Sequence, residues 1–428
     1  MLSSFYQLSG LCLLACTPAV LAQNAGIFLS TYVAPVNIEE QGPLVPSDYQ
    51  KYRPIFNDYG FAIRGNTTDG EDFSLWLFMY RQTGVEEVII DGDIMQLAFQ
   101  HGHFSGEERQ RMHDTPSVNV GQSLEDYYPV GEIKQAQDSK EATWDAGNIT
   151  LSYDGRNVWR ATGTHAGITV DITMKNTTDQ YYHIAPFEKL QGCSAKTASE
   201  NYHCSGKAGG IIHMSATGTI AYNKTVQTLD QAYGVHERII MSNEVASRVS
   251  TSQGSGGSWL HSWGSKFTFF VFGFDAGKGG YATKSMVNID GESYVSAAFN
   301  NQNATLAAKD VWLDPKSHQV TTTAWDVNVF TPVGHLVSAV TGFGRLYYYW
   351  VRAGGLIITQ QMIAEATATF TYNNGTVVSE KQFAFIEAFR TMYIATPNGS
   401  PEVIEMGEMG ENADDILRAQ QSLLAQEL

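Results

Sequence analysis

The sequence predicts an all-β protein made of two similar-sized antiparallel β units. Apolar and polar residues alternate along many short segments, and a strand places successive side chains on opposite faces. Glycine-containing turns separate these segments, a pattern typical of antiparallel hairpins. The chain has 428 residues, 43% of them hydrophobic, which is enough for two domains that each bury a core.

The clearest alternation covers residues 149–174, where Asp154-Gly155 and His165-Ala166-Gly167 interrupt it. Similar hairpin patterns occupy residues 61–80, 226–241, 267–295 and 364–378. Helical periodicity is convincing only at residues 105–113 and 414–424, where apolar side chains recur at helical spacing.

Two places for the domain boundary are open. We expect an N-terminal β domain at residues 23–225, a C-terminal β-barrel domain at residues 226–396 and an acidic tail or helix at residues 397–428, because the β pattern starts anew near residue 226. The Gly/Ser-rich residues 250–258 are either a long hairpin loop or the linker itself. A ligand cleft is expected where the two units meet.

The N-terminus resembles a cleaved signal peptide. Residues 1–22 carry no charged side chain, include an apolar run and end in Val20-Leu21-Ala22, with small side chains at the positions that a signal peptidase requires. No later segment approaches ~18 apolar residues, so no membrane span is expected. The mature chain should therefore enter the secretory route.

Cysteine and asparagine usage agree with secretion. Removal of the signal peptide leaves Cys193 and Cys204, which we expect to form a disulfide; a metal site is the competing interpretation. N-x-Ser/Thr sequons, the acceptors of N-glycans, occur at Asn66, Asn148, Asn176, Asn223, Asn303, Asn374 and Asn398.

Charge and motifs exclude several classes of function. Lys and Arg total 27 against 44 Asp and Glu, for a net charge of −17, which argues against a nucleic-acid partner. The sequence has no G-x-S-x-G nucleophile motif, no P-loop and no G-x-G-x-x-G motif that opens a helix. A serine hydrolase, a nucleotide hydrolase and a nicotinamide enzyme are therefore disfavoured, and no cofactor is expected.

One group of histidines has two interpretations. His101 and His103 would point to the same face of a strand and could share a zinc ion with His113. The surrounding segment is rich in Glu and Arg, which instead favours a solvated connector without metal. The connector is the interpretation that we prefer.

His236, Glu237 and Arg238 are the candidate catalytic residues. On a strand, His236 and Arg238 would face one side and Glu237 the other. A His/Arg face inside a β cavity could polarise a substrate carbonyl, and the His could carry a proton near neutral pH. An exposed strand of mixed charge is the structural alternative.

Aromatic residues form 12% of the chain and occur in clusters. Most must belong to the core, but a cavity lined by rings and a few polar groups would suit a bulky apolar small molecule. The candidate substrate-binding residues are Arg64, Trp76, Tyr80, Trp263, Tyr348 and Trp350.

Several segments resemble the lipocalin-like Diels-Alderases of fungal natural-product pathways. They are FAIRGNTTDG at residues 61–70, WDAGNIT at residues 144–150, DITMKN at residues 171–176 and AYGVHER at residues 232–238. The resemblance implies two lipocalin-like β-sandwich or barrel domains with the substrate between them. The chain departs from that family at Tyr59-Gly60-Phe61-Ala62, where an acidic residue of the family's strand is missing.

We therefore expect a cofactor-independent pericyclase for Diels-Alder or hetero-Diels-Alder cycloaddition. The resemblance implies that secretion agrees with two groups of relatives: hetero-Diels-Alderases of tropolonic sesquiterpene pathways, and the carotenoid- and kievitone-hydratase type of the same fold. The alternatives are a hydratase of the kievitone or carotenoid type and a non-enzymatic carrier of apolar ligands. A pericyclase would use Arg238 as a hydrogen-bond donor, whereas a hydratase needs proton transfer by Glu237 with His236. The sequence does not define the oligomeric state.

Overall fold

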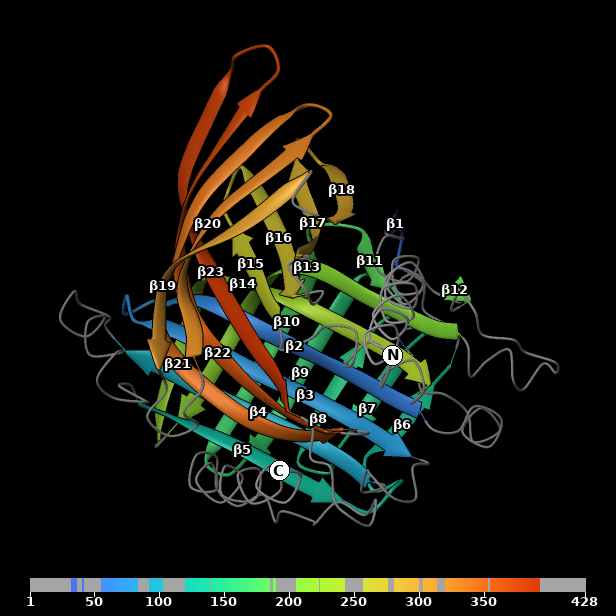
Figure 1. Cartoon of the computed structure of the whole chain (residues 1–428). Helices are drawn as coiled ribbons and strands as arrows, with labels where there is room; N and C mark the ends of the chain where they lie inside the picture. The colour runs from blue at the N-terminus through green and yellow to red at the C-terminus, as the bar shows by residue number, and fades with distance from the viewer. Residues whose placement is uncertain are drawn as a thin grey trace, which may run out of the picture.

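The computed structural model describes residues 32–36, 41, 55–83, 92–102, 120–138, 140–184, 188–189, 205–222, 224–242, 257–275, 281–299, 303–313, 320–352 and 355–392. The numbered elements in these residues are all β-strands, arranged in two antiparallel sheets (Figure 1). The all-β prediction is confirmed.

The first sheet has 14 strands. Its main path runs through β5 (Val120–Tyr128), β4 (Gly92–Gly102), β3 (Asp72–Thr83), β2 (Ile55–Thr67), β14 (Thr225–Ser242), β13 (Ser205–Tyr222), β10 (Ile168–Asn176), β9 (Val158–His165), β8 (Ile149–Tyr153), β7 (Ala142–Asp145) and β6 (Lys134–Gln137). The short strands β1 (Tyr32–Ala34), β11 (Gln180–Ile184) and β12 (Glu188–Lys189) join it beside β13. Because β5 and β6 end opposite edges of the path yet follow one another in the chain, the sheet curls to bring its edges together.

The second sheet has nine strands and closes in the same way. In spatial order they are β18 (Glu292–Phe299), β17 (Tyr281–Ile289), β16 (Phe267–Asp275), β15 (Gly257–Trp263), β23 (Val377–Met392), β22 (Gly355–Tyr372), β21 (Gly334–Arg352), β20 (Val320–Thr331) and β19 (Ala304–Leu313). Its two edges, β18 and β19, are again consecutive in the chain, and β19 also approaches β16 and β17.

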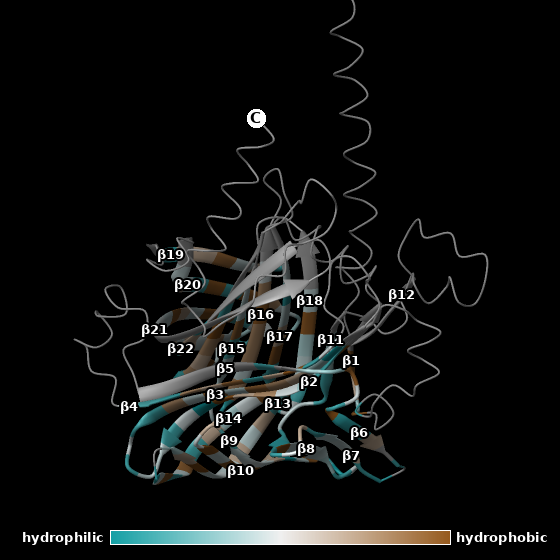
Figure 2. Cartoon of the chain, turned by 90° about the horizontal axis from the view of Figure 1, so that it is seen from below, coloured by the Kyte–Doolittle hydropathy of each residue, from teal (hydrophilic) through white to brown (hydrophobic). Residues whose placement is uncertain are grey.

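The alternation of the sequence reappears in the burial of the strands. Along β10, buried side chains alternate with exposed or half-buried ones, and Figure 2 shows the same alternation of hydrophobic and hydrophilic residues in the sheets. The turn between β17 and β18 has φ of 56° at Asp290 and 80° at Gly291. Two positive φ values suit the tight hairpin turns for which Asp-Gly is selected.

The division between the two sheets differs from the boundary expected near residue 226. β14, which was assigned to the second unit, pairs with β13 and β2 of the first sheet. The first sheet therefore continues to Ser242, and the second begins at Gly257. A new run of alternation marks a new strand but does not show which sheet that strand joins.

Three groups of buried side chains follow from this arrangement. The first-sheet core fills the curl of the first sheet and includes Phe61, Leu77, Trp144, Trp159 and Ile172. The second-sheet core fills the other curl and includes Phe269, Val327, Leu336, Ala366 and Ile386. The inter-sheet cluster joins residues of both sheets: Ala62, Trp76, Phe78, Tyr80, Ile94, Ala98, Tyr181, Ile211, Val235, Ile239, Trp263, Phe270, Phe272, Met286 and Phe385.

Several predictions lie outside the described residues. They concern the signal peptide at residues 1–22, the helical segments at 105–113 and 414–424, the tail at 397–428, Cys193 with Cys204, and the sequons Asn223 and Asn398. Of the other sequons, Asn148, Asn303 and Asn374 are exposed, and Asn66 and Asn176 are half-buried. In the described part of the chain, no helix is long and apolar enough to span a membrane.

Candidate functional site

The first sheet separates the three candidate catalytic residues. Glu237 pairs with Gly60 of β2 and Ile211 of β13, and paired residues on neighbouring strands share a face. Since Ile211 belongs to the inter-sheet cluster, Glu237 faces the second sheet. His236 contacts Tyr59, which belongs to the first-sheet core. The predicted alternation along this strand is confirmed.

The inter-sheet cluster contains three of the predicted substrate-binding residues. Trp76 stacks on Phe78 at 4.0 Å between ring centroids, and both lie with Tyr80 on β3. Trp263 enters the cluster from β15 of the second sheet. Glycine at position 60 leaves room for this arrangement, because a Cβ there would lie 2.2 Å from the Phe78 ring. Across the two sheets, Trp76 stacks on Phe385 of β23 with ring centroids 6.1 Å apart.

Arg64 lies on the same face and is also fully buried. Its guanidinium stands 5.0 Å from the ring centroid of Phe383, which packs against the inter-sheet cluster. Its Nη2 donates to Asp72 Oδ1 at 2.6 Å. The Arg64 side chain is therefore fixed from both sheets. The side chains of Tyr348 and Trp350, on β21, lie outside the described residues.

Buried glutamines place polar groups on this otherwise apolar face. Gln96 accepts hydrogen bonds from Trp76 Nε1 at 3.1 Å and from the Tyr80 hydroxyl at 2.9 Å. Gln100 shares the face through its register with Ser74 and Arg64. Both atoms of its side-chain amide are buried and have no hydrogen-bond partner among the described residues.

The second sheet contributes similar groups. Gln361 pairs with Glu387, which pairs with Trp259, and Trp259 packs against the inter-sheet cluster. Both amide atoms of Gln361 and the Trp263 indole nitrogen are buried and lack partners in the described part of the chain. Buried polar atoms are rarely left unbonded in a folded protein. These groups are therefore available to hydrogen-bond a ligand.

Two histidines join the sheets beside Trp263. His213 Nε2 lies 3.2 Å from His261 Nδ1, and His213 Nδ1 lies 3.1 Å from the Thr268 hydroxyl. Burial lowers the pKa of His213 to about 3, so this ring is neutral near pH 7 and does not supply a proton there.

A second polar group lies inside the first sheet. We call Gln41, Tyr59, Trp144, His236 and Arg238 the interior polar cluster. His236 Nδ1 lies 2.8 Å from the Gly60 carbonyl oxygen, and Nε2 lies 2.7 Å from Gln41 Oε1. Burial lowers the pKa of His236 to about 3; the bond to Gly60 opposes this shift and the charge of Arg238 adds to it. His236 is therefore neutral at physiological pH.

Arg238 is fully buried in the same cluster. Its Nη1 donates to Asn57 Oδ1 and to the Asp58 carbonyl oxygen, both at 2.5 Å, and its guanidinium lies 5.4 Å from the Trp144 ring centroid. It faces away from the inter-sheet cluster. If Arg238 donates to a substrate carbonyl, that carbonyl must lie inside the first sheet and not between the sheets.

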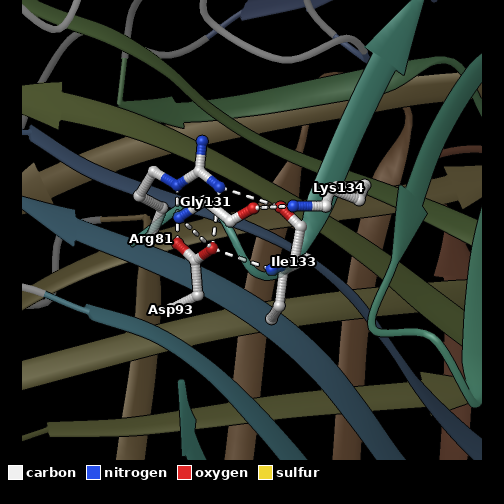
Figure 3. Close-up of polar contacts among 5 residues, drawn as sticks. All are labelled: Arg81, Asp93, Gly131, Ile133 and Lys134. Atoms are coloured by element: carbon white, nitrogen blue, oxygen red, sulfur yellow. Dashed lines mark hydrogen bonds and ion pairs between the residues drawn. The ribbon is translucent and has the colours of Figure 1, made fainter. Parts of the chain in front are cut away.

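The turn between β5 and β6 is fixed by Asp93, as Figure 3 shows. Arg81 Nε and Nη2 donate to the two Asp93 carboxylate oxygens at 2.5 and 2.7 Å, and the main-chain N–H groups of Gly131 and Ile133 donate to Oδ2 at 2.8 and 2.9 Å. Arg81 also donates to the Ile133 carbonyl oxygen at 2.8 Å. This Asp93 latch joins the turn to β3 and β4 and seats Ile133 in the first-sheet core.

The proposed histidine group is only partly described. His101 Nδ1 lies 2.7 Å from Glu71 Oε2 and 3.2 Å from Gln227 Nε2, and the ring stacks on Phe99. His103 and His113 lie outside the described residues. Where the structure describes the chain, no three His, Cys, Asp or Glu side chains are grouped to hold a metal ion.

Sequence reasoning missed several members of both groups. Gln96, Gln100 and Gln361 occupy strand positions that alternate normally, so nothing in the pattern separates them from exposed glutamines. Gln41 reaches His236 across a large sequence separation. One sequence signal for these groups was available at Tyr59-Gly60, where a glycine interrupts the aromatic residues of β2.

The chain is similar to several solved structures, with TM-scores below 0.5. The chain is similar to a protein assigned as AttH from Nitrosomonas europaea, with 8% identity and a TM-score of 0.48 over 83% of this chain and 98% of that one. Kievitone hydratase from Nectria haematococca has 10% identity and a TM-score of 0.46, with 84% of this chain and 94% of that chain covered. CghA with Sch210972 has 10% identity and a TM-score of 0.48, with 86% of this chain and 100% of that chain covered.

No family model matches the chain, and no curated protein matches it. At 8–10% identity the structural similarities assign no activity. The chemistry must therefore be inferred from the chain's own side chains.

Proposed function

We propose that the protein is a cofactor-independent enzyme that binds a bulky, largely apolar substrate between its two sheets and accelerates a Diels-Alder or hetero-Diels-Alder cycloaddition. The reaction type comes from the sequence resemblance. The observation that supports the binding region is the inter-sheet cluster, in which rings from both sheets surround buried amide and indole groups without described partners.

The aromatic rings suit the first requirement of such a reaction. A cycloaddition needs its diene and its alkene held at near-attack distance, and restricting two reacting groups in this way supplies much of the barrier reduction in oriented systems. Flat rings such as Trp76 and Phe78 offer extended apolar contact with defined geometry. A hydrophobic polyene or sesquiterpene-derived substrate fits this surface.

The polar groups suit the second requirement. A hydrogen bond to a carbonyl or quinone oxygen conjugated with the reacting alkene lowers the barrier as charge develops on that oxygen. The amide N–H groups of Gln100 and Gln361 and the indole N–H of Trp263 are such donors. None of them gains or loses a proton near neutral pH, and a cycloaddition requires no proton transfer.

A hydratase is the second candidate, because Glu237 lies on the same face. Hydration of an alkene needs a general acid and a base, and a half-buried carboxylate on the substrate side could take one of these roles. His236 faces the opposite side of the sheet, so the pair that the sequence suggested is divided.

The test compares two variants in water labelled with heavy oxygen. A carbonyl-conjugated polyene and an ortho-quinone methide with a sesquiterpene alkene serve as substrates, and product mass is followed over time. For a cycloaddition we expect no label in the product, unchanged turnover in Glu237→Gln and about 10²-fold slower turnover in Gln100→Leu, the typical effect of losing one positioned donor. Glu292→Gln, on the exposed start of β18, is the matched control.

Label in the product together with loss of turnover in Glu237→Gln would replace the cycloaddition by hydration. Ligand binding without turnover of either substrate would instead indicate a carrier.

A further inference from the structure

The second sheet has an exposed apolar surface at the end that lies away from the first sheet. In the described part of the chain, five large apolar side chains are exposed, and three of them, Phe330, Val337 and Val377, lie at this end on β20, β21 and β23. They are 53%, 45% and 59% exposed. Figure 1 shows that the hairpins β20–β21 and β22–β23 reach away from the first sheet. Apolar side chains gathered in this way on a protein surface are typical of an interaction site.

The register of the strands places these side chains on one face. Paired residues on neighbouring strands share a face, and three rows of paired residues cross β20, β21, β22 and β23. All members of the rows are exposed or half-buried. We call these twelve residues the distal face: Phe330, His335, Thr371 and Val377 in the first row; Asn328, Val337, Thr369 and Ser379 in the second; Asp326, Ala339, Thr367 and Lys381 in the third.

The distal face continues the surface that packs on the first sheet. On β23, Phe385 stacks on Trp76 of the first sheet, and Phe383 packs against the inter-sheet cluster. Side chains two residues apart point to the same side of a strand, so Lys381 and Val377 lie on the same face as Phe385. Part of this face is therefore a sheet-on-sheet interface, and the rest is uncovered among the described residues.

The two sides of the distal face carry opposite charges. In the third row, Asp326 lies on β20 at one side and Lys381 on β23 at the other. Asp326 pairs with the exposed Lys309 at 2.8 Å, whereas Lys381 has no ion pair within the described ranges. The first two rows contain no Asp, Glu, Lys or Arg. Burial lowers the pKa of His335, so this ring is neutral near pH 7.

This distribution of charge matches that of a second copy of the chain. A twofold axis parallel to the strands, between β21 and β22, exchanges the two sides of the face and stacks β20 of one copy over β23 of the other. Lys381 then lies over the partner's Asp326, and Val377 over the partner's Phe330. Each contact occurs twice, because such an interface is isologous. Stacked sheets keep their strands within about 30° of each other, which preserves this register near the axis.

We propose that the distal face is a dimerisation surface, at which two copies of the chain stack their second sheets about this twofold axis. Its twelve residues per copy are fewer than the ~20–30 residues per partner of a standard stable interface. The dimer is therefore weak, with a Kd on the order of 10 µM. The surface lies outside the inter-sheet cluster, so the proposal does not depend on the proposed catalytic function.

Sedimentation velocity ultracentrifugation of the full-length protein tests the surface. Between about 1 and 200 µM, the wild type should convert from monomer to dimer. Val377→Asp places a carboxylate against the partner's Phe330 and should raise the Kd at least about tenfold, because burying an unpaired charge is unfavourable. Val226→Asp is the matched control: Val226 is 63% exposed on β14 of the first sheet, and this variant should keep the wild-type Kd.

Two charge reversals test the register. Lys381→Glu places two carboxylates opposite each other at both contacts, and Asp326→Lys does the same with two cations. Each variant alone should therefore stay monomeric over the same range, because like charges oppose association. Mixed in equal amounts, the two variants have opposite charges at both contacts and should form a heterodimer about as tightly as the wild type dimerises. Circular dichroism confirms that each variant retains its β structure.

Three results would overturn the proposal: a wild type that stays monomeric to about 200 µM, an unchanged Kd in Val377→Asp, or a mixture of the reversal variants that associates no better than either variant alone. Co-sedimentation of a monomeric wild type with phosphatidylcholine vesicles would also overturn it and assign the face to a lipid surface. None of these results depends on turnover of a substrate.

Discussion

The interiors of the two sheets differ in the kind of polar side chain that they bury, although both sheets curl so that consecutive strands meet at their edges. The second-sheet core consists of aliphatic and aromatic side chains, and the buried polar side chains that share its face, such as Ser262, Ser338 and Gln382, are uncharged. In the first sheet, His236 and Arg238 are completely buried within the curl. Among the described residues, the second sheet therefore closes without a buried histidine or arginine on its inner face.

This difference has a physical consequence. Burying a polar side chain is unfavourable unless hydrogen bonds compensate for lost hydration, and burying a charged one costs more. The second curl buries uncharged groups, such as Ser262, whose hydroxyl donates to Gln382, whereas the first curl buries the Arg238 cation. The second sheet closes without a buried cation on its inner face in the described part of the chain, so closure of such a sheet does not itself require Arg238. Three measurements examine this comparison.

The largest effect is expected from the Asp93 latch, which fixes the closing turn of the first sheet. Asp93→Ala removes a fully buried carboxylate, which takes away the ion pair of Arg81 and the acceptor of two main-chain N–H groups. Breaking a buried pair typically costs ~3–5 kcal/mol, so we expect the free energy of unfolding to fall by about that amount in urea denaturation.

The second sheet offers the control. Asp326 pairs with Lys309 at 2.8 Å, but both side chains are largely exposed, and exposed pairs contribute about 0–1 kcal/mol. Asp326→Ala should therefore have little effect. A loss below about 1 kcal/mol in Asp93→Ala would mean that the latch does not hold the first sheet closed.

The second-largest effect is the dependence of stability on pH, because the first sheet buries two neutral histidines. The pKa values of His213 and His236 are lowered to about 3 by burial, against about 6.5 in an unfolded chain. Below pH 6.5 the unfolded state binds protons that the native state excludes, so stability falls as pH falls from about 6.5 toward 3. Each histidine should lower the free energy of unfolding by about 2 kcal/mol between pH 7 and pH 5.

The His236→Gln variant measures how much one imidazole ring contributes to this pH dependence of stability. The drop in the free energy of unfolding between pH 7 and pH 5 should be smaller by about 2 kcal/mol than in the wild type. An unchanged drop would show that His236 is accessible to protons in the native state, and the interior polar cluster would then be open to solvent.

Much of the fold follows from the sequence for a clear reason. Period-two alternation and Asp-Gly turns are local, so the hairpins at residues 149–174 and 267–295 could be predicted. Sheet membership is not local. β14 continues the alternation of its neighbours, yet only its long-range pairing with β2 shows that it belongs to the first sheet.

The same limit applies to the site. The face of each side chain along residues 236–238 was predictable, because strand geometry alone determines it. That Gln41 would meet His236, or that Asp93 would bind a turn some forty residues later, depends on contacts between distant segments. Trp76, Tyr80 and Trp263 were identified from clustering of rings, a signal that buried glutamines do not give.

The smallest effect is expected from one hydroxyl group in each sheet. The buried Tyr59 hydroxyl lies close to the Trp159 indole, and its own proton has no described acceptor, whereas the Tyr372 hydroxyl donates to Asp290 at 2.8 Å on the surface of the second sheet. Tyr372→Phe should cost about 0.5–1.5 kcal/mol, the usual contribution of one hydrogen bond. Tyr59→Phe should cost less, because the proton of the Tyr59 hydroxyl has no described acceptor and phenylalanine keeps nearly the same shape. Urea denaturation of the two variants measures both losses. A larger loss of unfolding free energy in Tyr59→Phe than in Tyr372→Phe would show that the buried hydroxyl contributes more to folding than the exposed hydrogen bond does.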